Sequence, residues 1–263
     1  MSPTPLLPAG AREPSWHRAT LRTVDDVRLS AHVLEPGAPP AGAVVLVHGF
    51  TAGGAHPSVV AQAEVLAAAG FTVVTFDLRG HGESAGVCTV GDEERHDVAA
   101  AVGIARESHS RIVVVGASMG AIATLRYAAT AEEVDGIEGV VAVSGPAGWA
   151  TPRTAIGLLN LVLIRTRPGR RVLARRTNVR VADRVAGSEP PTELVGRLQV
   201  PVAIVHGTAD RVIPPSAAHV LYAAAREPRR LVIVEGMGHA FHPAAQQPVL
   251  EAVEWARGGG GPR

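Results

Sequence analysis

The sequence predicts an α/β fold in which helices cover both faces of a mostly parallel sheet. Three observations support this fold class: short, continuously apolar segments recur along the chain, Ala-rich helical segments separate them, and polar residues follow the apolar segments directly. Continuous apolar runs are typical of strands that are buried on both faces, and their alternation with helices is typical of a doubly wound sheet. A chain of 263 residues suits one domain with an insertion.

The individual elements follow from apolar runs and from breaks at glycine and proline. A hairpin is expected first, with strands at residues 21–23 and 27–33 on either side of Asp25 and Asp26. Later strands are expected at 43–47, 72–76, 112–115, 140–143, 202–205 and 231–234. Helices are expected at 59–69, 92–107, 119–131, 216–225 and 244–256.

The alternation of strands and helices is interrupted between residues 146 and 198. We interpret this insertion as a small helical cap, and residues 18–145 and 199–257 as the core. An apolar segment at 156–164 would either line an acyl pocket or seat the cap on the core. The Pro-rich residues 1–17 are expected to be poorly ordered, and residues 258–263 are expected to form a flexible tail.

Composition narrows the classes of function. The formal net charge of +1 gives no electrostatic case for a nucleic-acid partner, and the single cysteine, Cys88, excludes an intramolecular disulfide. No apolar run is long enough for a signal peptide or a membrane span, so a soluble cytoplasmic protein is expected. All 25 basic residues are arginine, which is typical of a GC-rich bacterial genome.

The segment Gly116-Ala117-Ser118-Met119-Gly120 has the G-x-S-x-G pattern of a nucleophile elbow. Such a turn exposes the serine hydroxyl between a strand and a helix, and glycines are needed because the flanking backbone is crowded. A second match, Gly82-Glu83-Ser84-Ala85-Gly86, lacks a strand before it and a helix after it. Context therefore selects Ser118 as the candidate nucleophile.

A serine nucleophile needs a base and a group that orients the base. The elbow architecture predicts the chain order Ser, Asp, His, and Asp210 and His239 each follow a later predicted strand. Two alternatives have weaker positions: His242 precedes a proline at the start of the last helix, and Asp183 lies in the cap.

An acyl-transfer site also needs donors for the oxyanion. We expect these donors to be the backbone N–H groups of Met119 and Phe50, the latter in the turn after the strand at 43–47. Arg79 is expected to pair with Asp77 and to fix the neighbouring turn. A structural role is favoured for this turn, with substrate binding by His81 as the alternative.

Taken together, these motifs resemble the α/β-hydrolase superfamily over residues 40–257, and most of all its bacterial esterase, lysophospholipase and serine-aminopeptidase-like branch. The resemblance implies the α/β-hydrolase fold, with an eight-stranded, mostly parallel sheet and a cap after the sixth strand. A serine at the elbow argues against dehalogenases and epoxide hydrolases, which use an aspartate there, and the short cap argues against peptidase activity. The residues that carry the resemblance are His48-Gly49-Phe50, Asp77 to Ser84, Gly116 to Gly120, Asp210 and Gly238-His239.

The predicted function is hydrolysis of a small-molecule carboxylic ester, or of a thioester, without a metal or an organic cofactor. An acyltransferase using the same triad and a non-catalytic binding module on the same fold are the alternatives, and the oligomeric state stays open. Between residues 150 and 190, nine arginines face two acidic residues, a balance of +7. A solvated cap surface is the favoured interpretation, and contact with an anionic substrate or a membrane surface is the alternative.

Overall fold

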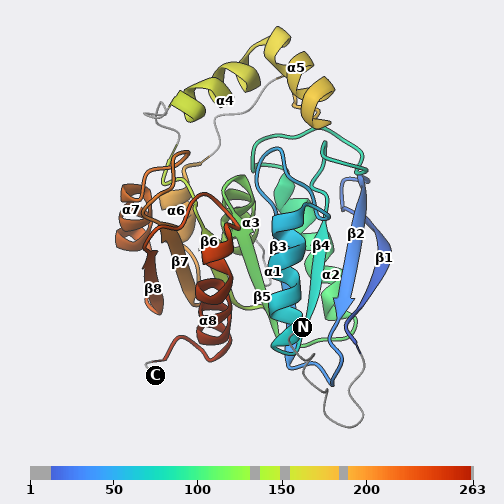
Figure 1. Cartoon of the computed structure of the whole chain (residues 1–263), viewed down its shortest axis with the longest axis vertical. Coiled ribbons are helices and arrows are strands. Elements are labelled where there is room, and N and C mark those ends of the chain that lie inside the picture. Colours follow the sequence, from blue (N-terminus) through green and yellow to red (C-terminus); the bar gives the residue numbers. More distant parts are fainter. Residues whose placement is uncertain (1–12, 131–136, 149–154, 184–188, 262–263) are drawn as a thin grey trace, which may run out of the picture.

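A computed structural model of the chain describes residues 13–130, 137–148, 155–183 and 189–261. Eight strands form one sheet in the spatial order β1-β2-β4-β3-β5-β6-β7-β8 (Figure 1). The strands are β1 (Ser15–Arg22), β2 (Arg28–Glu35), β3 (Gly42–Val47), β4 (Phe71–Phe76), β5 (Ile112–Ala117), β6 (Ile137–Val143), β7 (Val202–Gly207) and β8 (Arg229–Val234). The predicted α/β-hydrolase fold is confirmed.

The sheet is antiparallel at one edge and parallel elsewhere. β1 pairs with β2, and β2 with β4, in antiparallel register, whereas all later neighbours are parallel. The predicted N-terminal hairpin is present, but β1 begins at Ser15 and therefore includes residues 15–17, which were expected to be poorly ordered. These residues are ordered because β2 extends to Glu35, which pairs with Ser15, so that all eight residues of β1 have a partner in β2.

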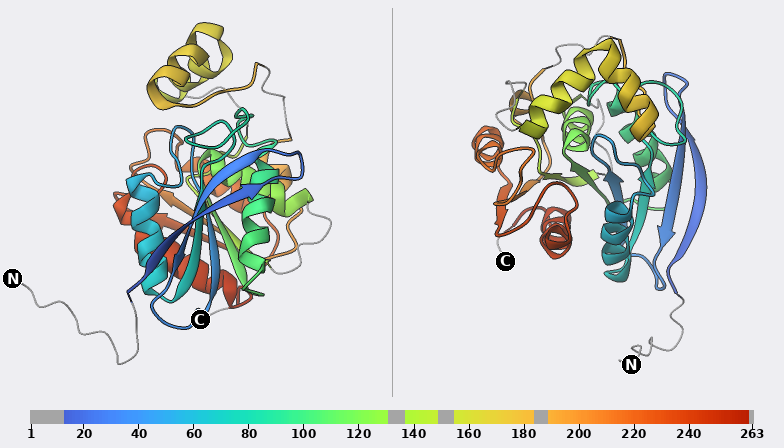
Figure 2. Two further views of the ribbon diagram at one scale, coloured as in Figure 1. Left: turned by 90° about the vertical axis from the view of Figure 1, so that its right-hand side faces the viewer. Right: turned by 45° about the horizontal axis from the view of Figure 1, so that its top comes forward.

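Helices cover the sheet on both faces, as Figure 2 shows in its left view. The helices of the core are α1 (Pro57–Ala68), α2 (Glu94–Arg106), α3 (Met119–Thr130), α6 (Pro191–Val195), α7 (Ser216–Ala224) and α8 (Gln246–Arg257). Apolar side chains of α1 and α8 are buried with one face of the sheet, and those of α2, α3, α6 and α7 are buried with the other. No helix of the described residues is both long and apolar enough to cross a membrane.

Two helices, α4 (Ala155–Arg165) and α5 (Arg167–Thr177), form the cap above the carboxyl ends of the parallel strands (Figure 1). The Thr166 hydroxyl accepts the Gly169 N–H and caps the start of α5, and Asn178 ends this helix in the left-handed conformation. α6 lies inside the predicted cap range but belongs to the core, because Leu194 and Val195 are buried with α3 and α7. Its five residues are too few to show a helical pattern in the sequence.

Candidate active site

Ser118 lies in a sharp turn between β5 and α3, as the elbow pattern predicts. Its φ of 54° is in the left-handed region, which non-glycine residues seldom adopt, and its side chain is only partly buried. The flanking glycines leave room for this turn. A Cβ on Gly116 would lie 2.3 Å from the Gly120 carbonyl oxygen, and a Cβ on Gly120 would lie 2.4 Å from the Val47 carbonyl oxygen. The turn therefore requires glycine at both positions.

His239 and Asp210 are in direct contact. The Nδ1 atom of His239 lies 2.8 Å from Oδ2 of Asp210, and the other carboxylate oxygen accepts the backbone N–H groups of Val212 and Ile213 at 2.8 and 2.9 Å. Burial raises the pKa of Asp210, but hydrogen bonds from His206 and His239 outweigh it and hold the pKa well below its ordinary value. Asp210 is therefore ionised, and its contact with Nδ1 fixes the orientation of the His239 imidazole.

The turn after β6 connects this pair with the elbow. The Ser118 backbone N–H donates to the Val143 carbonyl oxygen at 2.9 Å, and the Ala240 backbone N–H donates to the Ser144 hydroxyl at 3.1 Å. Ser118 and Ala240, the residue after His239, are thus both bonded to the turn after β6. Among the described residues, no hydrogen bond joins the Ser118 hydroxyl to the His239 ring. The Asp–His half of the relay is formed, and the serine link stays a prediction.

The turn after β3 lies against the elbow. A Cβ on Gly49 would be 3.2 Å from Cβ of Ser118, so Gly49 and the following Phe50 are beside the candidate nucleophile. His48 fixes this turn: its Nδ1–H donates to the Gly49 carbonyl oxygen at 2.8 Å, and its Nε2 accepts the Leu78 N–H at 2.9 Å. Burial, assisted by the nearby His81, lowers the pKa of His48 to about 3, so the ring stays neutral.

The predicted pairing of Arg79 with Asp77 is wrong. The Arg79 guanidinium binds Asp97 at 2.8 Å and Asp25 at 2.7 Å. The Asp77 carboxylate instead accepts the backbone N–H groups of Gly54 and Glu83 at 2.8 and 2.9 Å. Asp25 and Asp97 come from the β1–β2 turn and from α2, so no spacing in the sequence indicates them. Arg79 therefore anchors the segment after β4 to two distant elements.

The same segment explains two other residues. The Ser84 hydroxyl, in the second G-x-S-x-G match, is buried and donates to the Asp77 carbonyl oxygen at 2.6 Å, so this serine is a structural residue. His81 is also buried, and its ring makes edge contacts with His48 and Phe50 at centroid distances of 5.0 and 6.1 Å. His81 thus supports the turn that carries Phe50, in line with the structural role favoured from the sequence.

The two weaker triad candidates lie elsewhere. The Nδ1 atom of His242 accepts the Ala244 N–H at 3.2 Å and caps the short helix before α8. Asp183 pairs with Arg170 at 2.9 Å and is exposed. Within the described parts of the chain, no three His, Cys, Asp or Glu side chains are grouped as a metal site requires.

Comparison with known proteins places these motifs in a family. A model of the alpha/beta hydrolase family matches residues 44–252, which is most of the chain. The chain belongs to the α/β-hydrolase family. It is similar to a monoacylglycerol lipase of Mycolicibacterium smegmatis, with 29% identity over 88% of this chain and 92% of that protein. An uncharacterized protein of Mycobacterium tuberculosis is 26% identical over 89% of this chain and 76% of its own length.

Solved structures share the fold of this hydrolase. An esterase of Pyrococcus furiosus superposes with a TM-score of 0.69 at 22% identity, covering 94% of this chain and 89% of that one. An esterase of Thermogutta terrifontis gives a TM-score of 0.68 at 21% identity, over 93% of this chain and all of that one.

Three residues of the hydrolase site have roles that the sequence did not indicate. Ser144 holds the backbone beside His239, and His48 holds the turn of Phe50. His206 Nε2 lies 3.4 Å from the Asp210 carboxylate and 3.0 Å from the Ile213 carbonyl oxygen. Ser144 and His48 could be singled out as polar residues directly after strands, but their partners could not. His206 directly follows the predicted strand at 202–205 and is the penultimate residue of β7 in the structure; its partners could not be predicted either.

Proposed function

We propose that this α/β hydrolase is a serine hydrolase that cleaves a carboxylic ester, or a thioester, through an acyl-enzyme on Ser118. The observation that carries the proposal is the His239–Asp210 contact of 2.8 Å. It is supported by the left-handed φ of 54° at Ser118 and by the turn after β6, which is bonded both to Ser118 and to Ala240. The names of its relatives, a monoacylglycerol lipase and two esterases, favour the same reaction class.

The proposed reaction has two halves. His239 takes the proton of the Ser118 hydroxyl as the oxygen attacks the ester carbonyl, and Asp210 stabilises the imidazolium that forms. His239 then gives this proton to the departing alcohol or thiol, which leaves the acyl group on Ser118. In the second half, water loses a proton to His239 and attacks the acyl-enzyme. His239 then returns this proton to the Ser118 oxygen as the bond to the acyl group breaks and the acid leaves.

The proposed oxyanion hole consists of the backbone N–H groups of Phe50 and Met119. Met119 begins α3, so its N–H points out of the helix start, where the helix dipole favours negative charge. Gly49 lies against Ser118, and this supports a position of the next N–H group, that of Phe50, on the side of the oxyanion opposite to Met119. The Phe50 and Met119 side chains would then contact the acyl group.

Turnover of p-nitrophenyl esters with acyl chains of increasing length tests the proposal. We expect release of p-nitrophenol together with an equal amount of free acid, at a rate far above that of buffer. If an added alcohol collects the acyl group and no acid appears, the protein is an acyltransferase. A rate equal to that of the buffer for every ester and thioester tried would contradict a hydrolytic function.

A further inference from the structure

The cap helix α4 is apolar around its whole circumference but is not buried. Its sequence AIGLLNLVLIR has one polar residue before the final arginine. Leu159 is 57% exposed and Val162 is 51% exposed, with Ile156 and Leu158 close behind. Among the helices and strands that the structure describes, α5 is the one that packs closely against α4. A helix that is apolar on all sides is stable in water only if something covers it.

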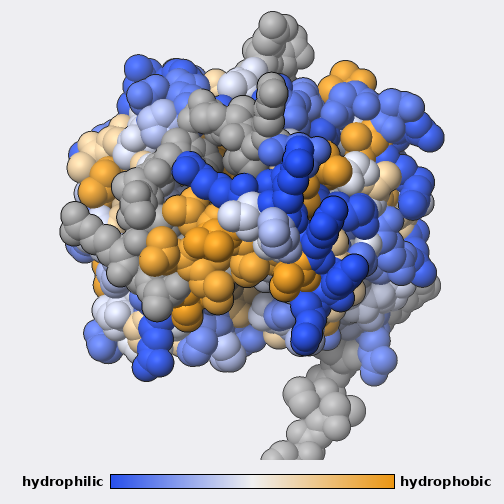
Figure 3. Space-filling view, turned by 90° about the horizontal axis from the view of Figure 1, so that it is seen from above, coloured by the Kyte–Doolittle hydropathy of each residue, from blue (hydrophilic) through white to orange (hydrophobic). Residues whose placement is uncertain are grey.

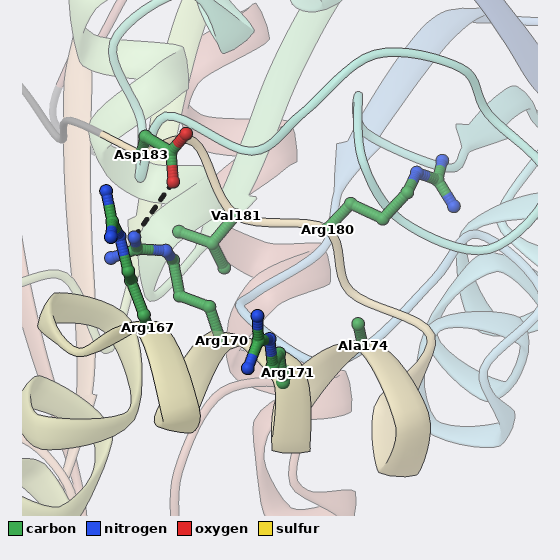
Figure 4. A pocket seen from close by; sticks show the side chains of 7 residues that line it. All are labelled: Arg167, Arg170, Arg171, Ala174, Arg180, Val181 and Asp183. Carbon is green, nitrogen blue, oxygen red and sulfur yellow. Dashed lines mark hydrogen bonds and ion pairs between the residues drawn. The ribbon is translucent and has the colours of Figure 1, made fainter.

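The neighbouring helix α5 is strongly basic. Residues 155–183 contain seven arginines and a single acidic residue, Asp183. Arg167, Arg170, Arg171 and Ala174 share one face of α5 and line a hollow of about 450 Å³ with the 180–183 segment (Figure 4). This spacing of i, i+3, i+4 and i+7 is that of one helix face.

Two arginines of the hollow are available to a ligand. Asp183 pairs with Arg170 at 2.9 Å, and the same Arg170 also donates to the Ile164 carbonyl oxygen at 3.2 Å. Within the described residues, the guanidinium groups of Arg167 and Arg171 have no hydrogen bond or ion pair, and both residues are exposed. Exposed guanidinium groups with no acidic partner suit phosphate, which they can bind in a bidentate way.

The apolar and basic surfaces adjoin each other on the outside of the cap. Viewed from above, an apolar area is bordered by hydrophilic residues along its upper and right-hand edges (Figure 3). A second copy of the chain would cover the apolar helix but would bring two arginine-rich helices together, and their charges would repel. An anionic lipid surface matches both features, because it offers hydrocarbon to α4 and phosphate to α5.

We propose that the α4–α5 cap docks on anionic lipid bilayers, with α4 in the interfacial layer and a lipid phosphate at Arg167 and Arg171. The cap is tied to the candidate site. The Cys88 N–H donates to the Arg180 carbonyl oxygen at 2.7 Å, and the Cys88 thiol lies 3.6 Å from the Met119 sulfur. Docking would therefore hold the carboxyl edge of the sheet near the bilayer. Resting on the proposed function, this inference narrows the substrate to an ester lipid drawn from such a surface.

Sedimentation with vesicles of phosphatidylcholine alone, or with 30% phosphatidylglycerol, tests the docking. We expect binding to the anionic vesicles to be about tenfold tighter and to weaken as salt is added. Leu159→Asn should weaken binding to the anionic vesicles about tenfold, because it replaces an apolar side chain that would insert into the lipid layer by a polar one. Arg171→Gln should weaken it about fivefold. The matched controls are Val220→Asn on α7, where Val220 is 50% exposed, and Arg226→Gln; both should bind like the parent.

Sedimentation measures binding and not turnover, so docking and hydrolysis can fail independently. Equal affinity for neutral and anionic vesicles, or equal losses in the cap variants and their controls, would overturn the docking proposal. So would a dimer in light scattering that Leu159→Asn converts to a monomer, because α4 would then be covered by a second copy. Circular dichroism of each variant ensures that a loss of binding is not a loss of fold.

Discussion

Replacing Ser118 by alanine should lower kcat/KM for a p-nitrophenyl ester by about 10⁴-fold or more. The substitution removes the oxygen that would carry the acyl group, and the remaining rate would come from the oxyanion donors and from binding alone. Alanine keeps the Cβ at this turn, so the elbow geometry should survive. The measurement is steady-state kinetics on purified protein, with circular dichroism to check the fold.

Ser84→Ala is the matched control for this substitution, because Ser84 is the other serine in a G-x-S-x-G sequence. Its hydroxyl is bonded to the Asp77 carbonyl oxygen and accepts the Ser30 N–H at 2.9 Å. We expect the control to lose about 1–2 kcal/mol of stability and to keep kcat/KM within about threefold. If Ser84→Ala abolished turnover while Ser118→Ala did not, the nucleophile would have been assigned to the wrong turn.

Replacing Asp210 by asparagine should lower kcat by about 10³- to 10⁴-fold and leave KM nearly unchanged. Asparagine can still accept the Val212 and Ile213 N–H groups through its oxygen, so the loop should keep its shape. Its amide then faces Nδ1 of His239 with a donor in place of an acceptor. The ring would take the tautomer with the proton on Nε2, which cannot accept the serine proton.

Separate determination of kcat and KM distinguishes this effect from a loss of substrate binding. A rise in KM with kcat unchanged would indicate that Asp210 acts on binding and not on the base. If the variant retained the kcat of the parent, Asp210 would not be part of the proton relay. Thermal unfolding should accompany both measurements, because Asp210 is buried and its carboxylate contacts His206 as well as His239 and the Val212 and Ile213 N–H groups.

The sequence predicted the features that depend on local pattern. The strand at 112–115 and the glycines around Ser118 could be predicted because each follows from burial or crowding within a few residues. The order of Asp210 and His239 was predicted from the elbow pattern, which places the acid and the base after later strands. The partners of Arg79 could not be predicted from the sequence, because Asp25 and Asp97 come close to Arg79 only when the sheet is formed.

The cap shows a second limit of the sequence. The apolar segment 156–164 was expected to line a pocket or to seat the cap on the core, and both interpretations assume that apolar residues are covered within the chain. The structure leaves Leu158, Leu159 and Val162 exposed. Hydrophobic periodicity tells which residues avoid water, but it does not tell whether the chain itself or another surface covers them.

Mapping the site of covalent attachment by a fluorophosphonate is the most direct test of the serine mechanism. Trypsin should release the peptide Ile112–Arg126, because cleavage follows Arg111 and Arg126 and the chain has no lysine; Ser118 is the one serine in it. We predict that mass spectrometry finds the phosphonyl group on Ser118 and that Ser118→Ala is not labelled. A fully active preparation that stays unlabelled, or carries the group on another residue, would contradict Ser118 as the nucleophile.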